Sequence, residues 1–237
     1  MGAAGDIRTN TDAILSTAWN RRTGQVVPKT DDVALKNGAV DLEAVVLYAD
    51  LAKSTKLAGT FQRTTAAKIV RAYLSAMTRL ITYHGGEIRS FDGDRVMGVF
   101  VGGNKNTSAA KCALRMNWAL TKVLRPKAEA KFPSLKKNGF VLEHCVGVHR
   151  SDLLVVRGGI RDNSDLVFIG TAPNLAAKLS DIRNAPYRSY ITWHVYDKLG
   201  KSAKIDAKTG RSFWQKRTLT LAGKKWTCYR SSWSWSP

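Results

Sequence analysis

The spacing of hydrophobic positions changes several times along the chain, and each change marks the start of a new element. Residues 44–50 (AVVLYAD) form an apolar run that ends on a carboxylate, which predicts a buried strand. Residues 61–83 carry apolar side chains at steps of three and four, the spacing of one helix face. Gly85 and Gly86 follow and end this helix. The pattern therefore begins with a strand and a helix.

The next segment predicts a β-hairpin. EIRSF (87–91) and RVMGVFV (95–101) read as two strands, and Asp92-Gly93 between them is a strong tight-turn signal. A second amphipathic helix is expected over about 106–125. Strand, helix, hairpin and helix thus follow one another in the first half of the chain.

The second half predicts mainly sheet. The expected elements are a basic loop at 126–138, strands at 140–150, 153–157 and 166–169, a helix from Pro173 to about 182, a strand and helix within 189–199, and paired strands at 212–221 and 225–231. The core order is β-α-β-β-α-β, which predicts an α+β, ferredoxin-like antiparallel sheet with helices on one face and a C-terminal hairpin.

The composition along the chain agrees with one folded domain flanked by an N-terminal arm and a C-terminal tail. The 237 residues are 44% hydrophobic and 24% charged, which excludes a disordered or low-complexity chain. Residues 1–40 are mostly small, polar and basic, and we expect an N-terminal helical arm and linker there. Residues 41–231 form the predicted domain, and the Ser/Trp-rich residues 232–237 form a tail.

The chain carries none of the usual export or membrane signals. No apolar run approaches the roughly 18–20 residues that span a bilayer, and the first residues lack the layout of a signal peptide. Cys112, Cys145 and Cys228 are widely separated, which argues against a disulfide framework and a structural zinc site. We expect a cytoplasmic protein without membrane contact.

The chain is strongly basic. Thirty-eight Lys and Arg against eighteen Asp and Glu give a net charge of +20. Such an excess attracts anions, namely nucleic acid, an anionic membrane or a phosphorylated small molecule, unless it is simply a solvated surface. Because the cations are spread along the whole chain, a dedicated DNA-binding helix is not indicated.

Two carboxylates are the strongest candidates for chemistry. Asp50 ends the first strand, and Asp94 lies in the turn between the second and third. In a β-α-β-β unit the first strand lies beside the third, so both carboxylates meet. They repel each other unless a cation lies between them, and Mg²⁺ or Mn²⁺ prefers such oxygen ligands. Taken singly, Asp94 has the alternative role of a turn residue, and Asp50 that of a helix cap.

The sequence around these carboxylates resembles the class III nucleotidyl cyclase domain over about residues 42–230. VVLYADLAKST (45–55) is similar to the strand that ends in the first metal-binding Asp, and FDGDRVMGVF (91–100) to the hairpin that supplies the second. GVH (147–149) and IGTAPNLAAKL (169–179) are similar to the third family motif. Residues 41–231 would then be the catalytic domain of a phosphorus-oxygen lyase.

This resemblance implies a set of site residues. Asp50 and Asp94 would bind two Mg²⁺ or Mn²⁺ ions per site, with the backbone carbonyl of Leu51 as a further ligand. Asn174 matches the asparagine that orients the ribose. Lys178 stands where purine cyclases have a phosphate-binding arginine, and a lysine lacks the planar bidentate fork of arginine.

The resemblance also implies a lysine on the C-terminal hairpin and a shared site. A lysine there binds the triphosphate in this family, and both Lys224 and Lys225 are candidates. The family builds each site from two subunits, so we expect a C2 homodimer with two shared sites and a nucleoside triphosphate as substrate. No nucleic-acid partner is expected.

The residues that read a purine base are absent. Ser90 and Val167 stand where adenylate cyclases have their purine-reading Lys and Asp or Thr, and Tyr48 brings a ring to the expected base pocket. Tyr48 has the alternative role of a core strand residue. The combination resembles the Pycsar pyrimidine cyclases of bacterial anti-phage defence.

That resemblance implies conversion of UTP to 3′,5′-cyclic UMP and pyrophosphate, with CTP to cyclic CMP as the less favoured option. The cyclic nucleotide would be a messenger read by a separate effector protein. Two alternatives remain open at the level of sequence. One is an adenylate or guanylate cyclase with atypical base recognition, in which Ser90 still hydrogen-bonds the base. The other is a catalytically inactive, nucleotide-binding cyclase-like domain, for which the substitution at Lys178 is the main argument.

Overall fold

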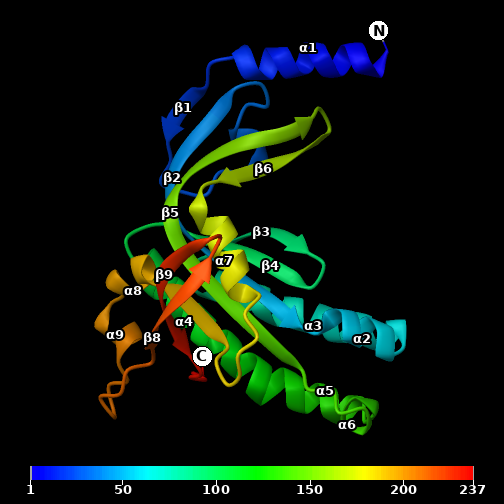
Figure 1. Cartoon of the computed structure of the whole chain (residues 1–237), viewed down its shortest axis with the longest axis vertical. Helices are drawn as coiled ribbons and strands as arrows, with labels where there is room; N and C mark the ends of the chain where they lie inside the picture. The colour runs from blue at the N-terminus through cyan, green and yellow to red at the C-terminus, as the bar shows by residue number, and fades with distance from the viewer. Residues whose placement is uncertain (1, 237) are drawn as a thin grey trace.

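A nine-stranded, mostly antiparallel sheet organises the part of the chain that this computed structural model describes, residues 2–236 (Figure 1). Its main path has the order β3-β4-β2-β5-β7-β9-β8, while β1 pairs with β2 and β6 with β5. The strands are β1 (Asn20–Thr23), β2 (Gly38–Ala52), β3 (Glu87–Asp92), β4 (Arg95–Phe100), β5 (Glu143–Ile160), β6 (Asn163–Ile169), β7 (Ser189–Thr192), β8 (Gln215–Leu221) and β9 (Lys224–Ser231). The predicted α+β fold with a C-terminal hairpin is confirmed.

Helices cover both faces of this sheet, so the expectation of helices on one face is wrong. They are α1 (Ala3–Ser16), α2 (Ser54–Thr60), α3 (Arg63–Tyr83), α4 (Lys105–Trp118), α5 (Arg125–Lys131), α6 (Ser134–Lys137), α7 (Thr171–Ser180), α8 (Trp193–Asp197) and α9 (Lys201–Lys204). Helices α3 and α4 pack on one face, and α7 packs on the other. Among the helices described between residues 2 and 236, none is both long and apolar enough to cross a membrane.

The central strand β2 owes its position to side chains that alternate between the two faces. Val45, Leu47 and Ala49 belong to the core under α3 and α4. Val46 and the half-buried Tyr48 belong to the smaller core on the α7 side. Because alternate residues of a strand share a face, the side chain after Tyr48 on that side is Asp50. Residue spacing in β2 thus directs Asp50 to the α7 side of the sheet.

The segment predicted as a basic loop at 126–138 is instead largely helical. Helix α4 continues through a π-helical segment (Ala119–Leu124) into α5, and the short helix α6 follows after a break at residues 132–133. Pro126 is the second residue of α5, and the π segment ends two residues before it. The local proline signal therefore marks a change of helix type rather than the end of the helix.

The two ends of the chain differ in how they pack. In the tail, the Trp233 and Trp235 rings lie 4.9 and 5.4 Å from the ring of Phe213, and the Asn117 amide donates to the backbone carbonyl of Trp233 at 2.7 Å. Helix α1, in contrast, buries no residue and extends away from the sheet (Figure 1). The expected linker after it contains β1, which pairs in parallel with β2.

Candidate active site

The two aspartates meet at the edge where β2 ends and β4 begins. The antiparallel register pairs Asp50 with Arg95, so Asp94, one residue earlier, lies next to this pair. Gly93, with φ at +61°, supplies the left-handed turn residue that brings the chain back into β4. Sequence reasoning predicted this meeting from the strand order, and the register agrees with it.

Both carboxylates are partly removed from water. The Asp50 side chain is 14% exposed, and burial raises the pKa of this carboxyl, opposed by the cation of Arg183 and reinforced by the negative charge of Asp94. Asp94 Oδ2 is buried and has no hydrogen-bond partner within residues 2–236. A buried carboxylate oxygen without a donor is costly unless a cation approaches it.

A guanidinium occupies the space in front of Asp50. Arg183, in the segment after α7, donates from Nη2 to Asp50 Oδ2 and from Nη1 to the carbonyl of Ser180. No motif in the sequence pointed to Arg183, because the ion pair joins residues 133 positions apart through tertiary packing. Its position shows that a cation is accommodated at this carboxylate.

The donor set fits a divalent metal ion. Two carboxylates and a backbone carbonyl at Leu51 are hard oxygen ligands, and Asp94 Oδ2 is an unused one. Residues 2–236 contain no group of three or more His, Cys, Asp and Glu side chains placed to hold a metal. Phosphate and water oxygens would therefore complete the coordination, which is how Mg²⁺ is commonly bound in phosphate-handling sites.

Tyr48 borders the same site with its ring. Its hydroxyl donates to Met97 Sδ at 3.2 Å, and the pKa of this phenol is raised chiefly by burial, with opposing effects from Arg95 and from a hydrogen bond with Ser90. The Arg95 guanidinium lies 5.3 Å from the centre of the Tyr48 ring. The structure therefore brings Tyr48 and Ser90 together.

Arg95 is a residue that sequence reasoning missed. It donates to Asp92 Oδ2 at 2.7 Å and lies 3.6 Å from Asp181 Oδ1, so two acidic groups hold it over the Tyr48 ring. The only sequence signal for a role of Arg95 at the site was its position directly after Asp94. Val167, in contrast, lies on β6, outside the strands that carry Tyr48 and Ser90, and this residue is 46% exposed.

Helix α7 carries the second group of predicted residues. Asn174 and Lys178 lie one turn apart and are both exposed, while Leu175, Ala176 and Leu179 are buried against the sheet. A Cβ at Gly147 would lie only 2.1 Å from the carbonyl oxygen of Ala176. Glycine in the GVH motif is thus required because α7 packs directly on β5.

Successive side chains of β9 point to opposite faces, so the two candidate lysines lie on different sides of the hairpin. Trp226 and Cys228 of β9 pack in the cluster that includes Leu175 and Leu179 of α7. Lys224 shares their face of the strand, whereas Lys225 lies on the opposite face. Of the two, Lys224 is therefore on the side of the sheet that carries Asn174.

Comparison with solved structures defines the class. The chain superposes on the guanylyl cyclase Cya2 with a TM-score of 0.67 at 18% identity, covering 83% of this chain and 95% of that one. It superposes on the guanylate cyclase domain of RhGC from Catenaria anguillulae, solved with GTP, with a TM-score of 0.65 at 16% identity, covering 82% and 99%. The fold is that of the class III nucleotidyl cyclases.

Comparison with curated sequences defines the family. A uridylate cyclase of Rhodovulum sp. (strain MB263) is 43% identical over 232 residues, which cover 98% of this chain and 97% of that protein. A uridylate cyclase of Burkholderia cepacia is 39% identical over 238 residues, with full coverage of both. No protein-family model matches the chain. This protein is a nucleotidyl cyclase and belongs to the uridylate cyclase family.

Proposed function

We propose that this protein converts UTP to 3′,5′-cyclic UMP and pyrophosphate. The observation that carries the proposal is the placement of Tyr48 on the same face of β2 as Asp50, two residues before it. A nucleotide bound at Asp50 would have its base near this ring. The full-length relatives named uridylate cyclase support uracil over cytosine as that base.

The ring of Tyr48 would select against purines by size. It is held in place by the contact with Met97 and by the Arg95 guanidinium above it. A purine extends one fused ring further than a pyrimidine, and excluding a ring discriminates far more than the ~1–3 kcal/mol of a single methylene. Ser90, beside Tyr48, would supply a hydroxyl to the base edge, whereas Val167, on β6, has no polar group with which to read a purine.

The two aspartates and the Leu51 carbonyl would hold two Mg²⁺ or Mn²⁺ ions. Such ions, when bound, acidify the ribose 3′-hydroxyl and neutralise the triphosphate. The 3′-hydroxyl would lose its proton to water and its oxygen would attack the α-phosphorus. The bond from that phosphorus to the oxygen bridging the β-phosphate would break, and pyrophosphate would leave. Arg183 must give up Asp50 before this arrangement can form, because a carboxylate oxygen cannot serve both partners fully.

Asn174, Lys178 and Lys224 would act on the same nucleotide from a second copy of the chain. Asn174 would orient the ribose, Lys178 would stabilise the charge that grows on the transferred phosphate, and Lys224 would bind the triphosphate, with Lys225 the less favoured candidate. All are exposed in the single chain. A C2 homodimer would place each set opposite the partner's aspartates and produce two equivalent sites.

The cellular role that we propose is anti-phage defence in the cytoplasm. It rests on the likeness of YAD (48–50) and FDGD (91–94), without purine-reading residues, to the Pycsar cyclases. The cyclic nucleotide would act as a messenger for a separate effector protein. Infecting bacteria that carry this gene, with and without Asp50→Asn, should show cyclic UMP accumulation and protection only with the active enzyme.

The substrate assignment is tested by incubating the purified protein separately with UTP, CTP, ATP and GTP in the presence of Mn²⁺ and identifying the products by mass. Cyclic UMP should be the main product, with cyclic CMP second. Faster formation of cyclic AMP or cyclic GMP would overturn the interpretation of Tyr48, Ser90 and Val167. No cyclic product from any triphosphate would instead favour an inactive nucleotide-binding domain.

A further inference from the structure

A groove of about 300 Å³ lies between α3 and α5, next to the π-helical segment that joins α4 to α5. Its floor is formed by Ile69 and Leu142, which are buried in the core under α3 and α4. Leu124, Ala128 and Phe132 form its apolar wall. The volume is at the lower end of the range of small-molecule pockets, so the groove can take one small apolar group.

The local sequence leaves this groove unfilled. Ala72 of α3 and Ala128 of α5 line it, one from each helix, and neither side chain is long enough to fill the space. The π-helical segment (Ala119–Leu124) directly precedes α5 and contributes Leu124 to the lining. Short π-helical segments within α-helices are frequent at functional sites.

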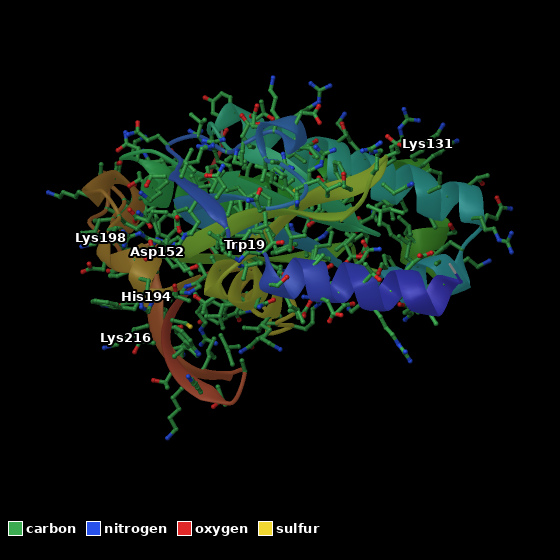
Figure 2. All side chains as sticks on the ribbon, turned by 90° about the horizontal axis from the view of Figure 1, so that it is seen from above. Trp19, Lys131, Asp152, His194, Lys198 and Lys216 are labelled. Atoms are coloured by element: carbon green, nitrogen blue, oxygen red, sulfur yellow. The ribbon has the colours of Figure 1, made fainter. Side chains whose placement is uncertain are left out.

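The groove is on the opposite side of the sheet from Asp50. Ile69 and Leu142 belong to the core under α3 and α4, whereas Asp50 is directed to the α7 side. None of the residues assigned to the metal ions, the base or the phosphates lines the groove. Figure 2 shows Lys131, at the rim of the groove, and Lys216, of the C-terminal hairpin, at opposite ends of the molecule. The groove is therefore separate from the cyclase site.

The rim of the groove is positively charged and uncompensated. Lys68, Lys127 and Lys131 line it, and no ion pair described within residues 2–236 includes any of them. Helix α3 contains Lys and Arg but no Asp or Glu. The only carboxylate of α5, Glu129, pairs with Lys136 at 3.6 Å. An anion is therefore attracted to this rim.

Apolar walls with a positive rim fit an anion that carries an alkyl chain. A symmetric contact with a second copy would bring the same lysines face to face, and they would repel each other. A bilayer surface is disfavoured, because none of the exposed large hydrophobic side chains in residues 2–236 belongs to α5 or α6, where insertion would need them. A volume of about 300 Å³ equals roughly ten water molecules at ~30 Å³ each, and a methylene group is of similar size.

We propose that this groove binds the free anion of a medium-chain fatty acid, with a chain of about ten carbons. The alkyl chain would lie against Ile69, Leu142 and Phe132, and the carboxylate would pair with the lysines of the rim. Burial of each methylene group favours binding, whereas the lysines distinguish the acid from a cationic amphiphile. Because no residue of the cyclase site is involved, fatty-acid binding and UTP turnover are separable properties.

The test is calorimetric titration of the full-length protein with decanoate in the absence of nucleotide. Wild-type protein should bind one decanoate per chain. Hexanoate should bind about tenfold more weakly or worse, because four fewer methylene groups are buried. Decyltrimethylammonium, which has the same chain and the opposite charge, should also bind at least about tenfold more weakly.

Two variants separate the charge of the rim from the space in the groove. Lys127→Gln combined with Lys131→Gln should weaken decanoate binding about tenfold or more, because two of the three rim charges are lost. Ala128→Leu should weaken it by a similar factor, because the larger side chain fills the groove. Both proteins should retain UTP turnover, which shows that they fold. Lys122→Ala is the matched control, because Lys122 is an exposed lysine of the π-helical segment that does not line the groove.

Three results would each overturn the proposal: wild-type affinity for decanoate in both groove variants, equal affinity for decanoate and decyltrimethylammonium, or no decanoate binding at millimolar concentration. Sedimentation of the protein with phosphatidylglycerol vesicles, unaffected by added decanoate, would also overturn it. That last result would show that the lysines of the rim serve a lipid surface rather than a free fatty acid.

Discussion

The two groups of site residues differ in how much of their surroundings one chain provides. Asp50 and Asp94 lie at the end of buried strands, with Asp50 only 14% exposed and Asp94 Oδ2 fully buried. Asn174 and Lys178 lie on the outer side of α7, exposed. The first group is enclosed by its own chain, whereas the second faces outward.

In the proposed dimer, this difference would make a single chain an incomplete site. Charged and polar groups stabilise a transition state most strongly where water is excluded. Exposed side chains are shielded from water only when another protein surface covers them. On the proposed mechanism, the outward-facing residues would therefore need a partner, whereas the aspartates would need only cations. The predictions below test each half separately.

The largest effect should come from the enclosed half. Asp50→Asn and Asp94→Asn should each reduce turnover of UTP by at least about a thousandfold, because each removes a charged metal ligand. Stability should change little or rise, since two repelling carboxylates become one. Asp152→Asn is the matched control, because Asp152 is an exposed carboxylate on β5. If either variant retains a tenth of the activity with Mn²⁺, the metal assignment is wrong.

Low pH should destabilise the fold beside both groups of site residues, because a buried histidine lies near each. His144, opposite Leu51, and His149, whose ring nitrogens lie 2.7 and 3.3 Å from the hydroxyls of Thr192 and Thr171, are both buried. Burial is the main cause that lowers the pKa of His144 to about 3 and of His149 to about 4.

These lowered pKa values determine the direction in which the free energy of unfolding changes with pH. Between about pH 6.5 and 4 the unfolded chain takes up protons that the folded chain refuses, so the free energy of unfolding falls with falling pH. At pH 5 the loss should be about 2 kcal/mol for each of these two histidines. Urea unfolding at pH 7 and pH 5 measures it, and His149→Gln should reduce the difference. Equal stability at both pH values would contradict the neutral, buried state.

The base pocket should respond to removal of the Tyr48 ring. Tyr48→Ala should lower UTP turnover at least about tenfold and reduce the preference for UTP over ATP, because the space for a second ring opens. Tyr48→Phe keeps the ring and should retain the exclusion of purines. Competition assays with mixed triphosphates measure the ratio directly. An unchanged UTP:ATP ratio in Tyr48→Ala would show that other residues select the base.

The smallest effect should come from the cation that now faces Asp50. Arg183→Ala should lower the Mn²⁺ concentration for half-maximal activity by up to about fivefold, the worth of a partly exposed ion pair. Arg79→Ala, an exposed arginine on α3, is the control. A rise in the Mn²⁺ requirement would show that Arg183 assists binding of the metal nucleotide rather than competing with it.

Local sequence patterns predicted the enclosed half well. The apolar run before Asp50 and the Asp-Gly turn before Asp94 are short-range signals, and the strand order that joins them follows from the β-α-β-β pattern. The contacts of Arg183 and Arg95 could not be predicted, because they depend on how α7 and the β3–β4 hairpin pack on β2.

The helix through Pro126 escaped prediction for a related reason. A proline is a local signal for a helix end, and a π segment that accommodates it has no simple sequence pattern. The choice between Lys224 and Lys225 likewise required the observed face of β9. Elements were therefore predictable where the signal is local, and partners across the sheet were not.

The most direct test of a shared site is complementation between two inactive variants. Asp50→Asn lacks the enclosed half, and Asn174→Ala lacks the outward-facing half, so each homodimer should be inactive. Mixing them under conditions of subunit exchange should form heterodimers with one intact site, and cyclic UMP formation should return to about a quarter of the wild-type rate for random pairing. An active enzyme that sediments as a monomer, or a mixed dimer that remains inactive, would contradict the account.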